Sequence, residues 1–91
     1  MPKIISVFYT YTSKKDLQSL QLKESKRIVL AIEKYTNTKD PLSKSKKLTG
    51  LFEGLYRYRI GDYRAIFQYD EKGNLIIITI LKIKHRKDIY K

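Results

Sequence analysis

Three β-prone segments follow one another in the second half of the chain, separated only by short turns that contain glycine. We expect strands at residues 55–60, 63–70 and 74–84, with Gly61-Asp62 and Glu71-Lys72-Gly73 between them. Connections this short can join only antiparallel neighbours, because a parallel pair needs a long crossover. The second half is therefore predicted to form an antiparallel sheet.

The first half predicts one more strand and two helices. Residues 3–11 are β-branched and aromatic, which favours a strand. A short helix through Leu17 and Leu20 follows, with Thr12 or Ser13 as its N-cap and Asp16 in its first turn. Residues 23–35 carry apolar side chains at helical spacing, and residues 36–47 combine turn signals with four lysines, which predicts a loop.

The order β-α-α-β-β-β predicts an α+β fold, with two N-terminal helices on one face of a mostly antiparallel sheet. A chain of 91 residues forms one small domain, which we expect to span residues 1–91. No stretch approaches the roughly 20 apolar residues of a membrane span, and the N-terminus lacks a signal-like apolar region. We therefore expect a soluble, cytoplasmic protein without a membrane partner.

The Gly61-Asp62 turn sets the register of the first hairpin. Glycine in the first position suits a two-residue type II′ loop, which pairs Ile60 with Tyr63. Side chains alternate between the faces, so counting outward separates an aromatic face from a basic face. The first holds Tyr56, Tyr58, Ala65 and Phe67, and the second holds Arg57, Arg59 and Arg64.

The second turn decides which lysines join the basic face. With Gly73 third, we expect a three-residue loop with a G1 bulge that pairs Asp70 with Asn74 and brings Arg64 near Ile80. The even-numbered bases of the last strand then share the arginine face; these are Lys82, Lys84 and, at the strand end, Arg86. A two-residue loop would instead turn Lys82 and Lys84 to the opposite face.

The charge of the chain points to a polyanionic partner. Lys and Arg outnumber Asp and Glu by 20 to 9, for a net charge of +11, and the excess is spread over both halves. RNA, DNA, an anionic lipid surface or an acidic protein would fit this charge, and so would a solvated lysine-rich surface with no partner. Placing Arg59 opposite Arg64 is unfavourable for a sheet, which favours a role in binding anions.

The residue types exclude several kinds of catalysis. There is no cysteine, His85 is the single histidine, and no glycine-rich phosphate loop or metal-ligand pattern occurs. We therefore expect no metal and no small-molecule cofactor. Arg, Lys and Tyr can still cleave RNA, because the substrate's 2′-OH is the nucleophile and guanidinium groups stabilise the charge that develops on the phosphate. The weak point of such a site is proton transfer.

Two segments carry a resemblance to a known family. The hairpin LYRYRIGDYRAIFQYD and the terminal KIKHRKDIY resemble the RelE-type toxins of the RelE/ParE superfamily, and the earlier elements fit the same plan over nearly the whole chain. The resemblance implies the toxin of a type II toxin–antitoxin pair. RelE-type toxins enter the ribosomal A site and cut mRNA by attack of the 2′-OH, and an acidic antitoxin neutralises them.

The resemblance also implies roles for individual residues. Arg64 corresponds to the arginine that holds the phosphate, Arg86 to the general acid for the leaving 5′-oxygen, and Tyr90 to the tyrosine that stacks on the mRNA. Arg57 and Arg59 stand where well-studied members carry lysines, one of which is the proposed general base. We expect Arg59 in the catalytic set and the following residues to bind RNA: Arg57, Lys46, Lys47, Lys82, Lys84 and His85.

Two other functions stay open at this point. A ParE-like toxin that acts on DNA gyrase shares the fold and the basic surface without cutting RNA. The second is a toxin-like domain that has lost activity and only binds an acidic antitoxin. It stays open because arginine in place of the family's lysines weakens proton transfer. The joint occurrence of GDYR, the His85-Arg86 pair and Tyr90 favours the ribonuclease.

Overall fold

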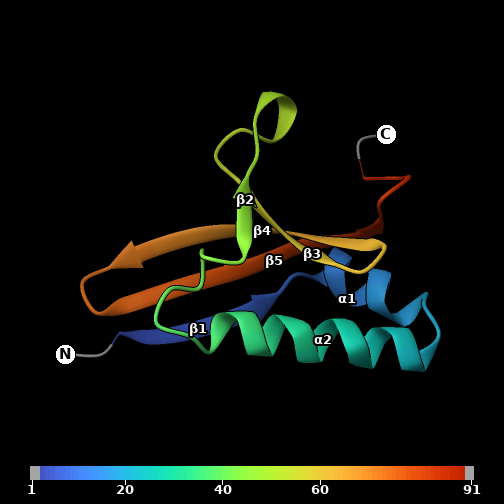
Figure 1. The fold of residues 1–91 in the computed structure, drawn as a ribbon, viewed down its shortest axis with the longest axis horizontal. Helices are drawn as coiled ribbons and strands as arrows, with labels where there is room; N and C mark the ends of the chain where they lie inside the picture. Colours follow the sequence, from blue (N-terminus) through green and yellow to red (C-terminus); the bar gives the residue numbers. More distant parts are fainter. Residues whose placement is uncertain (1–2, 90–91) are drawn as a thin grey trace.

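The computed structural model describes residues 3–89 and confirms the α+β order, with one additional edge strand. The elements are β1 (Ile4–Tyr9), α1 (Tyr11–Gln18), α2 (Leu22–Thr36), β2 (Ser45–Lys47), the 3₁₀ turn η1 (Gly50–Phe52), β3 (Tyr56–Ile60), β4 (Tyr63–Lys72) and β5 (Leu75–His85). They form one five-stranded sheet in the order β1-β5-β4-β3-β2 (Figure 1). Within residues 3–89, only the β1–β5 pair is parallel.

The β3–β4 hairpin has the predicted register. Ile60 pairs with Tyr63, Arg59 with Arg64, and the remaining pairs follow outward to Tyr56 and Phe67. Gly61 adopts φ +59°, the left-handed region that a type II′ turn requires at this position. The guanidinium of Arg27 on α2 lies where a β-carbon on Gly61 would stand, but this flexible side-chain end can move, so the backbone conformation is what favours glycine here. The predicted separation of the aromatic and arginine faces is confirmed.

The β4–β5 connection differs from the prediction. The loop holds two residues, Gly73 and Asn74, and Lys72 pairs with Leu75, so the expected three-residue loop is wrong. The register then shifts between Ile66 and Phe67, which pair with Lys82 and Ile80 and leave Leu81 as a bulge. Arg64 therefore lies opposite Lys84, and not near Ile80.

The bulge has a consequence for the basic face. A two-residue loop alone would carry Lys82 and Lys84 to the aromatic face, but the extra residue at Leu81 reverses the alternation once more. Before the bulge the even-numbered residues of β5 point into the core, and after it Ile83 does so. Lys82 and Lys84 thus reach the arginine face as expected, by a different route.

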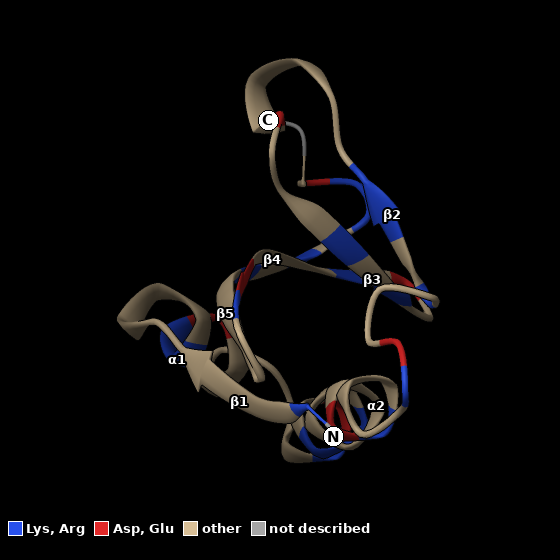
Figure 2. Cartoon of the chain, turned by 90° about the vertical axis from the view of Figure 1, so that its left-hand side faces the viewer, with Lys and Arg blue, Asp and Glu red and all other residues tan. Residues whose placement is uncertain are grey.

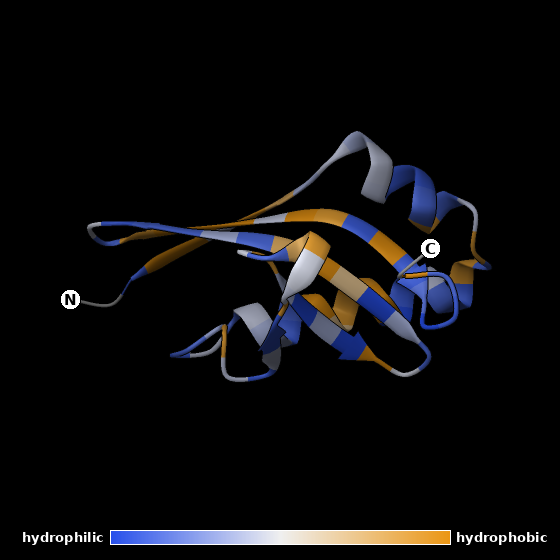
Figure 3. Ribbon diagram, turned by 90° about the horizontal axis from the view of Figure 1, so that it is seen from above, coloured by the Kyte–Doolittle hydropathy of each residue, from blue (hydrophilic) through white to orange (hydrophobic). Residues whose placement is uncertain are grey.

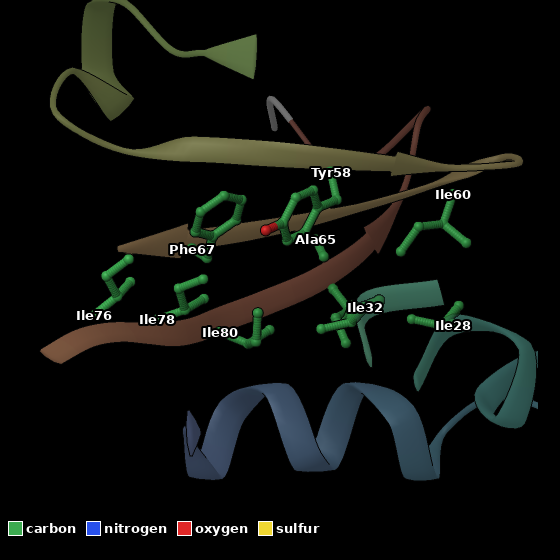
Figure 4. Close-up of a cluster of buried hydrophobic side chains, with 10 residues drawn as sticks. Ile28, Ile32, Tyr58, Ile60, Ala65, Phe67, Ile76, Ile78 and Ile80 are labelled. Atoms are coloured by element: carbon green, nitrogen blue, oxygen red, sulfur yellow. The ribbon is translucent and has the colours of Figure 1, made fainter. Parts of the chain in front are cut away.

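The core fills the space between the sheet and α2, and α1 packs against the end of β5 (Figures 1 and 2). The rings of Tyr58 and Phe67 stack at 4.3 Å between their centroids, and Ile28 and Ile32 of α2 belong to the same buried cluster (Figure 4). The buried Tyr58 hydroxyl donates to the Pro41 carbonyl at 2.7 Å, and burial raises the pKa of this tyrosine. Apolar residues run along the strands, and hydrophilic residues occupy the hairpin turns (Figure 3).

Two details of the N-terminal half also differ from the prediction. Thr10, and not Thr12 or Ser13, is the N-cap of α1, because its hydroxyl accepts a hydrogen bond from the Ser13 amide. The segment predicted as a loop at 36–47 contains the short edge strand β2, which pairs with β3. Neither helix within residues 3–89 is long and apolar enough to cross a membrane.

The segment from β2 to β3 forms an arm that projects from the sheet (Figure 1). A second apolar cluster lies at its base, where Leu48 packs with Ile66 of β4 and with Ile89 near the C-terminus. Ile89 is only 1% exposed, so the C-terminal turn is fastened to the arginine face of the sheet. This cluster fixes the position of the segment that carries Arg86.

Candidate nucleic-acid interface

Two rows of basic residues cross the face of the sheet opposite α2. The first row consists of Lys46 on β2, Arg57 on β3 and Lys82 on β5, with Ile66 of β4 between them. Figure 2 shows Lys and Arg gathered on β2 and β3. Neighbouring strands lie about 4.8 Å apart, so the row spans about 14 Å. Leu48 and Ile89 cover Ile66 in the middle of the row, so its basic residues flank the second apolar cluster.

The second row consists of Arg59, Arg64 and Lys84, which are direct cross-strand neighbours on β3, β4 and β5. The Arg64 Nη1 donates to the carbonyls of Gly61 and Tyr63, both at 2.9 Å, so its guanidinium is held across the hairpin turn. These bonds orient the group before any ligand arrives, which is what electrostatic stabilisation of a phosphate requires.

Arg86 joins this row at the hairpin turn. Its backbone amide donates to the Asp62 carbonyl at 2.7 Å, and its Nε lies 3.5 Å from the Asp62 carboxylate. Both side chains are largely exposed, so the ion pair itself is weak and a phosphate can compete for the arginine. Tyr90, the remaining predicted catalytic residue, lies outside the described residues.

Lysine 82 lies over an aromatic ring from the arm. Its Nζ is 4.5 Å from the centroid of the Phe52 ring, a cation–π contact that holds the lysine in its place in the first row. The contact of Phe52 with Lys82 was not predicted, because nothing in the neighbouring sequence shows where the arm folds.

Two predicted RNA-binding residues lie on the other face of the sheet. Lys47 pairs with Tyr56, and His85 pairs with Tyr63, so both alternate away from the basic rows. The His85 ring meets the Tyr63 ring edge-on at 5.4 Å, and its Nδ1 accepts a hydrogen bond from the Lys87 amide. These contacts hold the His85 ring against Tyr63 and the C-terminal turn.

Two acids on this side of the molecule were not assigned to the site from sequence. Asp16 of α1 bonds to Lys84, and Asp62 pairs with Arg86. Asp16 is 68 residues from Lys84, and no spacing rule links a helix to a strand end over that separation. Within residues 3–89, Lys84 and Arg86 therefore each have an acidic partner beside the basic rows.

Comparison with known proteins decides the family. The model described as "ParE toxin of type II toxin-antitoxin system, parDE" matches residues 7–90 of this chain. The chain belongs to the RelE/ParE superfamily of type II toxins. This membership agrees with the observed order of the elements.

Individual relatives of this RelE/ParE toxin agree with the assignment. Toxin RelG of Mycobacterium tuberculosis is 29% identical over 89 residues, covering 94% of this chain and 95% of RelG. The archaeal RelE–RelB complex from Pyrococcus horikoshii contains a chain 32% identical, with a TM-score of 0.69 and coverage of 97% and 99%. The RelB–RelE antitoxin–toxin complex from Methanococcus jannaschii contains one 33% identical, with a TM-score of 0.61 and coverage of 91% and 94%.

Proposed function

We propose that this RelE/ParE toxin is a ribosome-dependent endoribonuclease that cuts mRNA in the A site. The attacking group is the 2′-OH of the substrate, so the protein supplies orientation, charge stabilisation and proton transfer. No metal takes part in this scheme, because the developing charge on the phosphate is met by guanidinium groups.

One observation carries the proposal: Arg59, Arg64 and Lys84 lie side by side, with Arg86 held next to them at the same turn. A row of like charges is unfavourable within a sheet unless an anion lies over it. Guanidinium groups bind phosphate oxygens in a bidentate manner, and Arg64 is already oriented by two backbone carbonyls.

Within this scheme each residue has a separate task. Arg64 stabilises the phosphorane. A lysine of the two rows accepts the proton of the attacking 2′-OH, and Arg86 passes a proton to the departing 5′-oxygen. Arg59 contacts the phosphate from the neighbouring strand, and the first row binds the flanking backbone. Tyr90 stacks on a base of the mRNA, as its counterpart does in the family.

A cognate acidic antitoxin is the proposed protein partner. The chain carries +11, and the solved relatives from Pyrococcus horikoshii and Methanococcus jannaschii were crystallised as complexes of RelE with RelB. An acidic protein seated on the basic rows would exclude mRNA by direct competition. The site of action would be the cytoplasm, where ribosomes are found.

Inhibition of DNA gyrase is the second candidate function. It is favoured by the family model that matches residues 7–90, which is described for the ParE toxin. The same basic face would then contact the gyrase–DNA complex without cleaving RNA.

Parallel assays with one protein preparation separate the two functions. A defined mRNA is incubated with the toxin, with and without translating ribosomes, and the cuts are mapped; a gyrase supercoiling reaction runs beside it. The ribonuclease predicts cuts at the A-site codon only when ribosomes are present, with supercoiling unaffected. Intact mRNA together with lost supercoiling would reject the ribonuclease in favour of gyrase.

A further inference from the structure

Asp16 lies where β5 loses its parallel neighbour. The β1–β5 pairing ends at Tyr9 and Ile80, and the chain then turns into α1. Beyond that point the edge of β5 would present unpaired amides. Asp16, on the last turns of α1, fills this gap, and its side chain is only 12% exposed.

The carboxylate of Asp16 makes two bonds with different purposes. Its Oδ2 accepts the backbone amide of Ile83 at 2.9 Å, which replaces the missing strand partner. Its Oδ1 lies 2.9 Å from the Nζ of Lys84, the neighbour of Arg64 in the second basic row. One side chain therefore ties α1 to the strand end and also holds a lysine of the proposed site.

We infer that Asp16 is a positioning residue that presents Lys84 to the RNA phosphate beside Arg64; this rests on the proposed function. An ammonium group has three donors, and the bond to Asp16 uses one of them. The Lys84 side chain remains 42% exposed, so its other donors can reach a ligand. A lysine that is already held loses less conformational freedom when it binds phosphate.

Open space adjoins Lys84 on the side of α1. A cavity of about 400 Å³ opens beside the ion pair, with Tyr63, His85 and Asp88 among its lining residues. Tyr63 and His85 alternate away from the basic rows, so the cavity lies on the other side of Lys84 from Arg64. The anchored ammonium thus stands between the arginine row and an open, polar space.

The variant Asp16→Asn separates the two bonds. Its amide oxygen can still accept from Ile83, so the strand end keeps its partner, but the ion pair to Lys84 is lost. Removing a carboxylate also raises the net charge of the toxin, and charge alone would then strengthen RNA binding. Positioning predicts the opposite sign, which makes the direction of the change decisive.

The experiment measures single-turnover cleavage of ribosome-bound mRNA as a function of toxin concentration. We expect Asp16→Asn to raise the half-saturating concentration about three- to tenfold, with the saturating rate nearly unchanged. Asp16→Glu should recover part of the loss. Asp16→Asn combined with Lys84→Met should be no worse than Lys84→Met alone, because the carboxylate acts through the lysine. Lys23 is an exposed lysine on α2, and Lys23→Met is the matched control for Lys84→Met.

Several outcomes would overturn the inference. An unchanged or lower half-saturating concentration in Asp16→Asn would do so, and so would additive losses in the double variant. If Asp16→Asn does not fold, Asp16→Glu and Lys84→Met are compared with the wild type instead. The inference is rejected if both variants have the half-saturating concentration of the wild type. Failure of the wild type to cut ribosome-bound mRNA would reject the proposed function itself, whereas a cutting wild type with an indifferent Asp16 rejects only the positioning role.

Discussion

Arg59 is exposed and faces two like charges, so removing its charge should stabilise the fold while it weakens the site. It lies directly opposite Arg64 on β4 and two residues from Arg57 on the same face of β3. Lys84 adds little to the repulsion, because Asp16 balances its charge. We expect Arg59→Gln to raise the free energy of unfolding and to lower RNA cleavage in the same protein.

The size of the stabilisation follows from the spacing of the charges. Cross-strand neighbours lie about 5 Å apart, and residues two apart on a strand about 7 Å. In water at about 0.15 M salt, screened repulsion from Arg64 and Arg57 together amounts to about 0.7 kcal/mol. At about 0.01 M salt, where screening is weak, the same repulsion amounts to about 1.2 kcal/mol. Side chains that lean away from one another lower these figures, and the lower effective dielectric near a protein surface raises them.

Urea unfolding of the wild type and Arg59→Gln at the two salt concentrations measures the effect. The variant should be the more stable protein at both, with the difference larger at low salt. Arg59→Lys, which keeps the charge, should show no such salt-dependent gain. A destabilised Arg59→Gln, or a difference that does not change with salt, would refute the view that the row is a strained anion site.

Three further changes test other parts of the structure. Tyr58→Phe leaves the buried Pro41 carbonyl without its donor and should lower the free energy of unfolding by about 1–3 kcal/mol in urea titrations. Ile89→Ala should cost about 2 kcal/mol in the same titrations and reduce cleavage more than Tyr58→Phe does, because it releases the turn that carries Arg86. Stability should also fall as the pH rises above about 10, since tyrosines of the unfolded chain ionise there. Burial raises the pKa of Tyr69 to about 12, so the folded state keeps that proton above pH 10. In thermal melts, the melting temperature of Tyr69→Phe should therefore fall less steeply with pH than that of the wild type.

Local patterns were sufficient to predict the β3–β4 hairpin. Gly61 determines the turn type, the turn type determines the register, and the register separates the aromatic face from the arginine face. Each step depends on residues close in sequence, where backbone sterics dominate. The order of the elements was predictable for the same reason.

The β4–β5 pair shows where such reasoning stops. Gly73 is compatible with a two-residue loop and with a three-residue loop, and the two differ in every later pairing. The bulge at Leu81 then depends on packing across the sheet, which one strand's sequence does not encode. The prediction placed Lys82 and Lys84 on the correct face although its loop was wrong.

Long-range contacts were beyond prediction from the sequence. The bond from Asp16 to Lys84, and the burial of Ile89 against Leu48, each join segments far apart in the chain. Their side chains are ordinary for a helix surface and for a chain end. Only the folded sheet brings them to the basic face, and for this reason the supporting residues of the site were missed while its arginines were found.

The most direct test of the central claim uses one ribosome-bound mRNA in two forms, with ribose or 2′-deoxyribose at the nucleotide preceding the cut. The account predicts that the wild type cuts only the ribose form, and that Arg64→Ala cuts neither while it stays folded. Cleavage of the deoxy form would contradict attack by the 2′-OH. Undiminished cleavage by a folded Arg64→Ala would contradict the assignment of the site to the arginine face.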